Sequence, residues 1–323
     1  MKTRTLKLTA LCLTAALVSG SAAIADEIRY GLWAKEGEAQ YEGAVEFKRV
    51  VEEGSDHTVT IYPGNQLGTP REMIAQLALG TTQVMASGDP GIKEIEYLAL
   101  PYLMKGMGNY EAVINSDIGT AWNDKLINER RIRLLGFMPR SPRQISANVV
   151  INDMSDLGGL KLRAPERDYY VQSLSALGAN PTPMAFKEVY TALQTGVVDG
   201  QENPIETIYA QKFYEVQKGV AMVDYIVKPA YVMISESFWS GLSDDDKALM
   251  QKANDASTAK ILELLPDQEK KYIEEMQAAG VTVTYPDKAE FIEATQDVRD
   301  DLGKGIWGDE TYEAIVEIGQ KDL

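Results

Sequence analysis

The chain has 323 residues, of which 45% are hydrophobic, and a formal net charge of −16 at pH 7. This acidic balance argues against nucleic acid or an anionic lipid surface as the partner, because both are bound through clustered Lys and Arg side chains. The length allows two lobes, or one large α/β domain, with a core that needs no disulfides.

The N-terminal residues have the pattern of a cleaved export signal. Three basic residues within the first seven precede an apolar stretch at 8–18, and alanines at 23 and 25 suit a signal peptidase. We therefore expect residues 1–25 to be a signal peptide that is removed after Ala25, with an uncleaved membrane anchor as the alternative. Cys12, the only cysteine, would leave with this signal, so the exported chain would hold no thiol.

Beyond the signal, strand-like and helix-like segments alternate, which is typical of α/β architecture. In chain order, the residues predict a strand at 27–32, a helix at 41–53, a strand at 58–62, a helix at 69–80, a strand at 82–86, a helix from 117, strands at 132–137, 144–151 and 160–164, helices at 166–177, 186–195 and 205–218, strands at 220–226 and 231–235, a helix at 243–280, a strand at 281–285 and two acidic helices that finish the chain. We expect Pro266 to interrupt or kink the long helix, because proline lacks a backbone N–H. No Pro/Gly/Ser-rich linker divides the chain, so two lobes would have to share strands across a hinge.

The helix at 69–80 has clear signals at both ends. Thr69 is a capping residue, Pro70 takes the first helical position and Glu72 the third, which together predict a capping box. Gly80 predicts a left-handed stop.

Few residues are available for catalysis. His57 is the only histidine, and we expect it to be an ordinary surface residue because it follows a polar run at 54–56. Without a cysteine or a second histidine beyond the signal, Cys nucleophiles, His-based triads and His-rich metal sites are disfavoured. No carboxylate pair is singled out by its spacing, so we expect no catalytic residue, no metal and no cofactor.

One pattern of the dinucleotide-binding type, G-x-G-x-x-G, occurs at 303–308. An acidic amphipathic helix precedes it where that motif needs a strand, and too few residues follow to complete a βαβ unit. We interpret the pattern as a helix stop and turn.

Four arginines gather in one part of this acidic chain: Arg140, Arg143, Arg163 and Arg167. Arg163 lies near the end of a predicted strand, and strand ends beside crevices are where open α/β sheets bind ligands. Its guanidinium has the planar fork that matches a carboxylate. From the residues alone, a surface ion pair is the commoner role for such an arginine.

The surrounding segments are specific. They read SDLGGLKLRAP at 155–165, LGANPTPM at 177–184, FKEVY at 186–190, ALQTG at 192–196 and VDGQENP at 198–204. Together they closely resemble the signature of the solute-binding proteins of tripartite ATP-independent periplasmic (TRAP) transporters, the DctP family. NQLG at 65–68 and QKFYEV at 211–216 are similar to that family as well, so the resemblance spans essentially the whole exported chain.

This resemblance implies a two-lobed α/β clamshell of the periplasmic-binding-protein kind, with a hinge and long C-terminal helices. We expect lobe I to comprise residues 26–140 and 229–268, and lobe II residues 141–228 and 269–323. Closure of the two lobes would enclose the ligand.

The resemblance also implies site residues. Arg163 would form a two-pronged salt bridge to a ligand carboxylate, with Arg143 as the second arginine of the family. Asn203 would orient the ligand, and Phe186 would be the aromatic residue of the pocket.

The central segment is most similar to the sialate-binding branch of the family, whereas the N-terminal half departs from it. Trp33 falls where that branch has a polar contact, so we expect it to narrow the pocket and favour a smaller or flatter ligand. Tyr231, Glu72 and Asp89 are further candidate specificity contacts, and for Glu72 the capping role competes.

The function implied is that of a monomeric periplasmic solute-binding protein. It would capture a small organic anion, such as a sugar acid or hydroxy acid, and deliver it to the small and large membrane subunits of a TRAP transporter. The alternatives are an exported carboxylate-dependent lyase or glycosidase, and a periplasmic ligand sensor.

Overall fold

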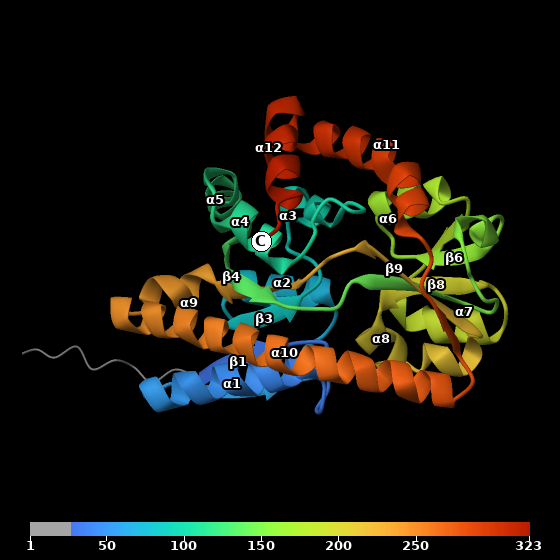
Figure 1. Cartoon of the computed structure of the whole chain (residues 1–323). Helices are drawn as coiled ribbons and strands as arrows, with labels where there is room; N and C mark the ends of the chain where they lie inside the picture. The colour runs from blue at the N-terminus through green and yellow to red at the C-terminus, as the bar shows by residue number, and fades with distance from the viewer. Residues whose placement is uncertain (1–26) are drawn as a thin grey trace, which may run out of the picture.

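The computed structural model describes residues 27–323, so the predicted signal peptide lies outside the described residues. This part of the chain folds into two mixed β-sheets that lie beside one another, each flanked by helices (Figure 1). The α/β prediction is confirmed.

The first sheet has the strand order β2-β1-β3-β10-β4. Its strands are β1 (Glu27–Gly31), β2 (Thr58–Tyr62), β3 (Val84–Ser87), β4 (Ile132–Met138) and β10 (Ala230–Ser235). β1 pairs in parallel with β2 and β3, whereas β10 runs antiparallel between β3 and β4. A late strand is thus inserted into a sheet built from the N-terminal part of the chain.

The second sheet has the order β11-β9-β5-β8-β6-β7. Its strands are β5 (Arg143–Ala147), β6 (Lys161–Ala164), β7 (Asn180–Pro183), β8 (Gly200–Pro204), β9 (Gly219–Ile226) and β11 (Thr282–Thr284). The chain passes between the sheets three times: through two short connections, 139–142 and 227–229, and through the long segment 236–281 that leads from β10 to β11. The proposed lobe limits at 140/141 and 228/229 fall in the two short connections.

The helices confirm most of the sequence predictions. They are α1 (Ala39–Gly54), α2 (Pro70–Leu79), α3 (Lys93–Glu96), α4 (Met107–Ile114), α5 (Asp117–Arg130), α6 (Asp168–Ala176), α7 (Val189–Gln194), α8 (Ile205–Ala210), α9 (Glu236–Gly241), α10 (Asp244–Ala278), α11 (Lys288–Trp307) and α12 (Asp309–Gly319). Helix α2 has the predicted capping box between Thr69 and Glu72, and Gly80 ends it in the left-handed conformation. None of the helices in the described residues combines the length and the apolar character that crossing a membrane requires.

Helix α10 runs along both sheets, with α11 and α12 on the opposite side of the molecule (Figure 1). It packs against α1 and β4 of the first sheet and against α8 beside the second. The predicted interruption at Pro266 is wrong, because α10 is one continuous helix of 35 residues with Pro266 inside it. Pro266 and Leu262, whose carbonyl loses its helical partner, are both exposed, so water can satisfy that carbonyl.

This path bears on the lobe limits. α10 crosses position 268 without a break, and α12 packs on α4, where the Lys105 N–H donates to the Gly319 carbonyl at 3.1 Å. The assignment of 269–323 to lobe II remains a proposal.

Several local predictions are corrected. The helix expected at 205–218 ends at Ala210, because Lys212 has a φ of 57°, and a 3-10 turn follows. In the 303–308 pattern only Gly308 forms the stop, since the two earlier glycines lie inside α11. His57 is buried, with 5% exposure, its Nε2 3.8 Å from Asp246 Oδ1 and its ring against Phe238, so the expected surface position is wrong.

Candidate functional site

Arg163 lies on β6, a strand held between β7 and β8, and is 97% buried. Its Nε and Nη2 donate to the Met184 carbonyl at 3.2 and 3.0 Å, and its guanidinium carbon lies 5.8 Å from the centre of the Phe186 ring. Among residues 27–323, no carboxylate lies within ion-pair distance of this guanidinium. Arg163 is therefore a buried cation without an acidic partner from the described chain.

Arg143, on β5, has the opposite arrangement. Its Nε and Nη2 donate to the two carboxylate oxygens of Glu202 on β8, the Nη2–Oε1 distance being 2.7 Å. Glu202 is fully buried and also accepts the Tyr225 hydroxyl at 2.6 Å. The charge of Arg143 is thus matched within the protein.

The two arginines also differ in their pKa. Burial lowers the pKa of Arg163, and the attraction of Glu202 offsets this only in part. For Arg143, burial acts in the same direction, but the charge and hydrogen bonds of Glu202 outweigh it, so the pKa is raised. Both groups remain charged, and Arg163 is the one that an added carboxylate would stabilise more.

Asn203 lies next to this pair on β8 and is 4% exposed. Its Oδ1 accepts Arg143 Nη2 at 3.1 Å, and its Nδ2 donates to Gln201 Oε1 at 2.5 Å. Gln201 in turn donates to Ser146 Oγ at 2.9 Å. These bonds hold the Asn203 amide in one orientation.

The molecule has two halves, one built around each sheet. Among the predicted site residues in the half around the second sheet, Phe186 is the most exposed, at 42%. It meets Phe213 edge to face at 6.1 Å between ring centres. The structure therefore brings Arg163, Phe186, Arg143 and Asn203 together around β6 and β8.

Trp33 follows β1 of the first sheet and reaches the connection to the second. The guanidinium carbon of Arg140 lies 5.2 Å from the Trp33 ring centre, and Arg140 Nε is 3.4 Å from Glu206 Oε1. Glu206 is buried and the Arg140 side chain is 12% exposed, and burial lowers the pKa of Arg140 and raises that of Glu206. Trp33 thus lies beside a largely buried ion pair in the connection between the sheets.

Asp89 makes a direct link between the two halves. Its Oδ2 is 3.1 Å from Nη2 of Arg167, the residue that caps the N-terminus of α6. Nε of the same arginine lies 2.6 Å from Glu96 Oε1, also in the first half. One arginine of the second half is thus bound by two carboxylates of the first.

The remaining two predicted residues have structural partners. Tyr231 is fully buried in β10, and its hydroxyl donates to the Ile95 carbonyl at 3.2 Å. Glu72 is exposed, and Oε2 accepts from the Thr69 N–H at 2.7 Å and the Thr69 hydroxyl at 2.9 Å. Within the described part of the chain, no hydrogen bond or ion pair joins Glu72 to Arg143 or Arg163.

Sequence reasoning missed Glu202, Tyr170 and Lys228. Tyr170 lies against Arg143, whose guanidinium carbon is 5.0 Å from its ring centre, and against Lys228, whose Nζ is 5.8 Å from it. The Lys228 ammonium donates to the Tyr169 hydroxyl at 2.8 Å. The one available signal was a lone lysine between two apolar strands in the second connection between the sheets.

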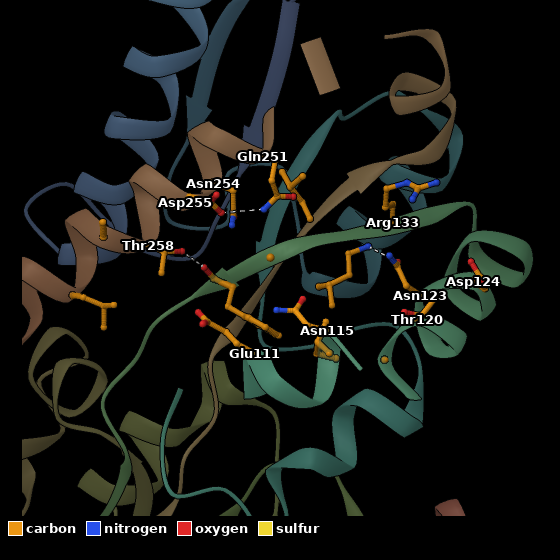
Figure 2. A pocket seen from close by; sticks show the side chains of 18 residues that line it. Glu111, Asn115, Thr120, Asn123, Asp124, Arg133, Gln251, Asn254, Asp255 and Thr258 are labelled. Atoms are coloured by element: carbon orange, nitrogen blue, oxygen red, sulfur yellow. Dashed lines mark hydrogen bonds between the residues drawn. The ribbon is translucent and has the colours of Figure 1, made fainter. Parts of the chain in front are cut away.

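A separate cavity of about 730 Å³ lies beside the β4 edge of the first sheet (Figure 2). It is lined by α4, α5, α10 and the edge strand β4, and contains none of the predicted site residues. Asn123 Oδ1 accepts the Leu134 N–H at 3.0 Å, and the Thr258 hydroxyl donates to the Phe137 carbonyl at 2.8 Å (Figure 2). These side chains satisfy backbone groups at the edge of β4 that would otherwise be free to pair with another strand.

Comparison with known proteins places the chain among binding proteins. The family model for bacterial extracellular solute-binding protein, family 7 (DctP), matches residues 30–304. The sialic acid-binding periplasmic protein SiaP of Vibrio cholerae is 37% identical over 308 residues, which cover 91% of this chain and 95% of that protein.

Solved structures agree in sequence and fold. A TRAP periplasmic solute-binding protein of Roseobacter denitrificans with bound L-galactonate is 31% identical, with a TM-score of 0.78 over 90% of this chain and 97% of that one. A protein of the same description from Polaromonas, bound to D-erythronate, is 28% identical, with a TM-score of 0.82 over 92% and 100% of the two chains.

Proposed function

The chain belongs to bacterial extracellular solute-binding protein family 7, and from this premise we propose that it captures a small organic acid in the periplasm through a salt bridge to Arg163. It then delivers the acid to the membrane subunits of a TRAP transporter. The three relatives described above are named for sialic acid, L-galactonate and D-erythronate, which supports a sugar acid as the ligand class.

One observation carries the proposal: Arg163 is 97% buried and has no acidic partner among the described residues. A buried charge is costly unless it is paired, so such an arrangement is retained where a ligand supplies the counter-charge. The two nitrogens bonded to Met184 leave Nη1 and the second hydrogen of Nη2 for a carboxylate.

Arg143 and Asn203 serve as the second contact. Glu202 occupies the Nε side of Arg143, so only its remaining Nη1 hydrogens can reach the ligand. Charge-assisted hydrogen bonds contribute about 1.5–3 kcal/mol each, and a few of them reach the roughly −8 kcal/mol of micromolar affinity. Phe186 covers one face of the Arg163 guanidinium and keeps water from it.

Ligand binding is proposed to close the two halves. Arg163 and Asn203 belong to the second sheet, whereas Trp33 and Asp89 belong to the first half and complete the site on closure. A ligand that touches both halves binds the closed form better and shifts the population toward it. The membrane subunits then distinguish the closed, loaded form from the open one.

Thermal-shift and calorimetric titration with sugar acids, hydroxy acids, keto acids and dicarboxylates tests the proposal, since a ligand that binds only the folded state raises the Tm. Arg163→Ala should abolish the shift. The matched control is Arg133→Gln, which removes an arginine from the separate cavity on the first sheet. Equal responses of wild type and Arg163→Ala would sink the proposal, and loss of binding in Arg133→Gln alone would move the site to that cavity.

The same titrations address an enzymatic role. The bound acid should be recovered unchanged by chromatography after long incubation. Conversion of the acid would favour the lyase or glycosidase alternative.

A further inference from the structure

Among residues 27–323, Lys228 is, after Arg163, a second buried cation without a carboxylate partner. It is 93% buried, and among residues 27–323 its one hydrogen bond goes to the Tyr169 hydroxyl, at 2.8 Å. Its Nζ also lies 5.5 and 5.8 Å from the ring centres of Tyr169 and Tyr170. A hydroxyl and two ring faces attract an ammonium group but do not neutralise it.

Lys228 lies close to Arg143, with Tyr170 in contact with both. Tyr170 is in contact with Lys228 and also with Arg143, whose guanidinium carbon is 5.0 Å from the same ring. One aromatic ring therefore separates the ammonium group from the guanidinium beside Asn203. Lys228 also lies in the connection 227–229 between the two sheets.

The neighbouring acids are engaged elsewhere. Glu96, whose charge acts on the Tyr169 hydroxyl, is bonded to Arg167 Nε at 2.6 Å. Asp89 is bonded to the same arginine, and Glu202 to Arg143. Lys228 and Arg163 are thus the two buried cations of this region whose contacts include no carboxylate.

We infer that Lys228 is a second ionic contact of the ligand site, and that it selects an acid with two carboxylates over an acid with one. The inference rests on the proposed function, in which Arg163 holds the first carboxylate. Lys228 holds the second carboxylate, at the other end of the ligand. An ammonium group suits this role because it accepts an oxyanion from several directions, whereas the guanidinium fork fixes the first carboxylate in one plane.

Matched pairs of acids test the inference by calorimetry. D-Erythronate is paired with meso-tartrate, D-galactonate with galactarate, and butyrate with succinate. Within each pair the chain length is equal, and the sugar pairs also share their hydroxyl configuration, so the second carboxylate is the difference. The expected result is at least tenfold tighter binding of the diacid in the pair that fits the site.

Variants assign that preference to Lys228. Lys228→Met should weaken diacid binding at least tenfold and change monoacid binding less than threefold, whereas Lys228→Arg should keep the preference. Lys270→Met, at an exposed position on α10, removes one positive charge without touching the site and should leave both affinities unchanged. Circular dichroism melting of each variant shows whether it is folded.

The outcomes separate the two claims. A monoacid that binds as well as its diacid, or a preference that survives in Lys228→Met, overturns the inference and leaves the proposed function standing. Should no acid bind at all, the proposed function fails and the inference with it. If Lys228→Met does not fold, the preference of the wild type and the behaviour of Lys228→Arg still decide.

Discussion

Glu202 on β8 grips Arg143 on the adjacent strand β5 through both carboxylate oxygens, in a fully buried position. This pairing distinguishes Arg143 from Arg163. Arg143 is neutralised by the protein, whereas Arg163, on the other side of β8, is left for a partner from outside.

Removing the Glu202 charge should therefore destabilise the fold. Glu202→Gln leaves the Arg143 guanidinium buried without a counter-charge and should lower the free energy of unfolding by about 3–5 kcal/mol, measured by urea denaturation. Saturating ligand should raise the unfolding free energy of Glu202→Gln by more than it raises that of wild type, because the ligand carboxylate then faces two unpaired arginines. A loss below about 1 kcal/mol would contradict the buried pair.

Arg163→Met should behave in the opposite way. It replaces an uncompensated buried charge with an apolar side chain of similar length, so the free energy of unfolding should hold or rise by about 1–2 kcal/mol. Ligand binding, measured on the same protein, should fall at least 100-fold, as expected for loss of two charge-assisted hydrogen bonds of about 1.5–3 kcal/mol each. Marked destabilisation would indicate that Arg163 supports the fold instead.

The Arg167 link between the halves should favour the closed form. Its side chain is 44% exposed, so the effect should be modest. Arg167→Gln should increase the radius of gyration measured by X-ray scattering and weaken ligand binding about two- to tenfold. Arg49→Gln, which breaks ion pairs within α1 alone, is the control and should change neither quantity. Unchanged scattering in Arg167→Gln would show that this arginine does not hold the halves together.

The buried Glu206 should make stability depend on pH. Burial raises the pKa of Glu206 above its ordinary value of 4.5, so the folded state binds a proton more tightly than the unfolded state does. Its contribution to stability is then present below pH 4.5 and is lost as the pH rises through the folded-state pKa. The difference in unfolding free energy between Glu206→Gln and wild type should consequently grow over that range. A difference that stays constant with pH would argue against the raised pKa.

Two substitutions distinguish the roles of Glu72. If its carboxylate serves only the α2 capping box, Thr69→Ala and Glu72→Ala should lower the Tm by similar amounts and leave ligand affinity unchanged. Loss of affinity in Glu72→Ala alone would instead make this residue a ligand contact. Calorimetry and thermal melts on the same samples give both quantities.

Regular patterns in the sequence predicted the elements that obey simple rules. The capping box at Thr69, the left-handed Gly80 and the apolar strands of the first sheet were all foreseen, because each depends on local chemistry. Strand β8 was missed because its buried residues include Gln201, Glu202 and Asn203. Hydrophobic periodicity cannot find a strand whose interior is a polar network, and such a network occurs where a site is built.

The candidate site shows the same limit. The family motif placed Arg163, Arg143, Asn203 and Phe186, and the structure brings them together. Glu202 lies in the same motif as Asn203, but the arginine that it neutralises, Arg143, is on another strand, and Lys228 comes from a connection outside the motif. Which charged side chains from distant segments meet depends on the tertiary fold, which a local motif does not specify.

Helix α10 has a mechanical consequence. Its earlier turns pack Ile261 and Leu265 into the core around α1, whereas Tyr272 stacks on Tyr209 of the second half, 4.2 Å between ring centres. This helix of 35 residues, about 52 Å long, thus packs against both halves of the molecule, which the proposed closure would move relative to each other. Such a movement would bend α10 or separate one of these two packing contacts. Pro266 lies between them and removes one backbone hydrogen bond of the helix, so the helix bends most easily there. Under the proposed closure, the resistance of α10 to bending would oppose the movement and take up part of the free energy of ligand binding.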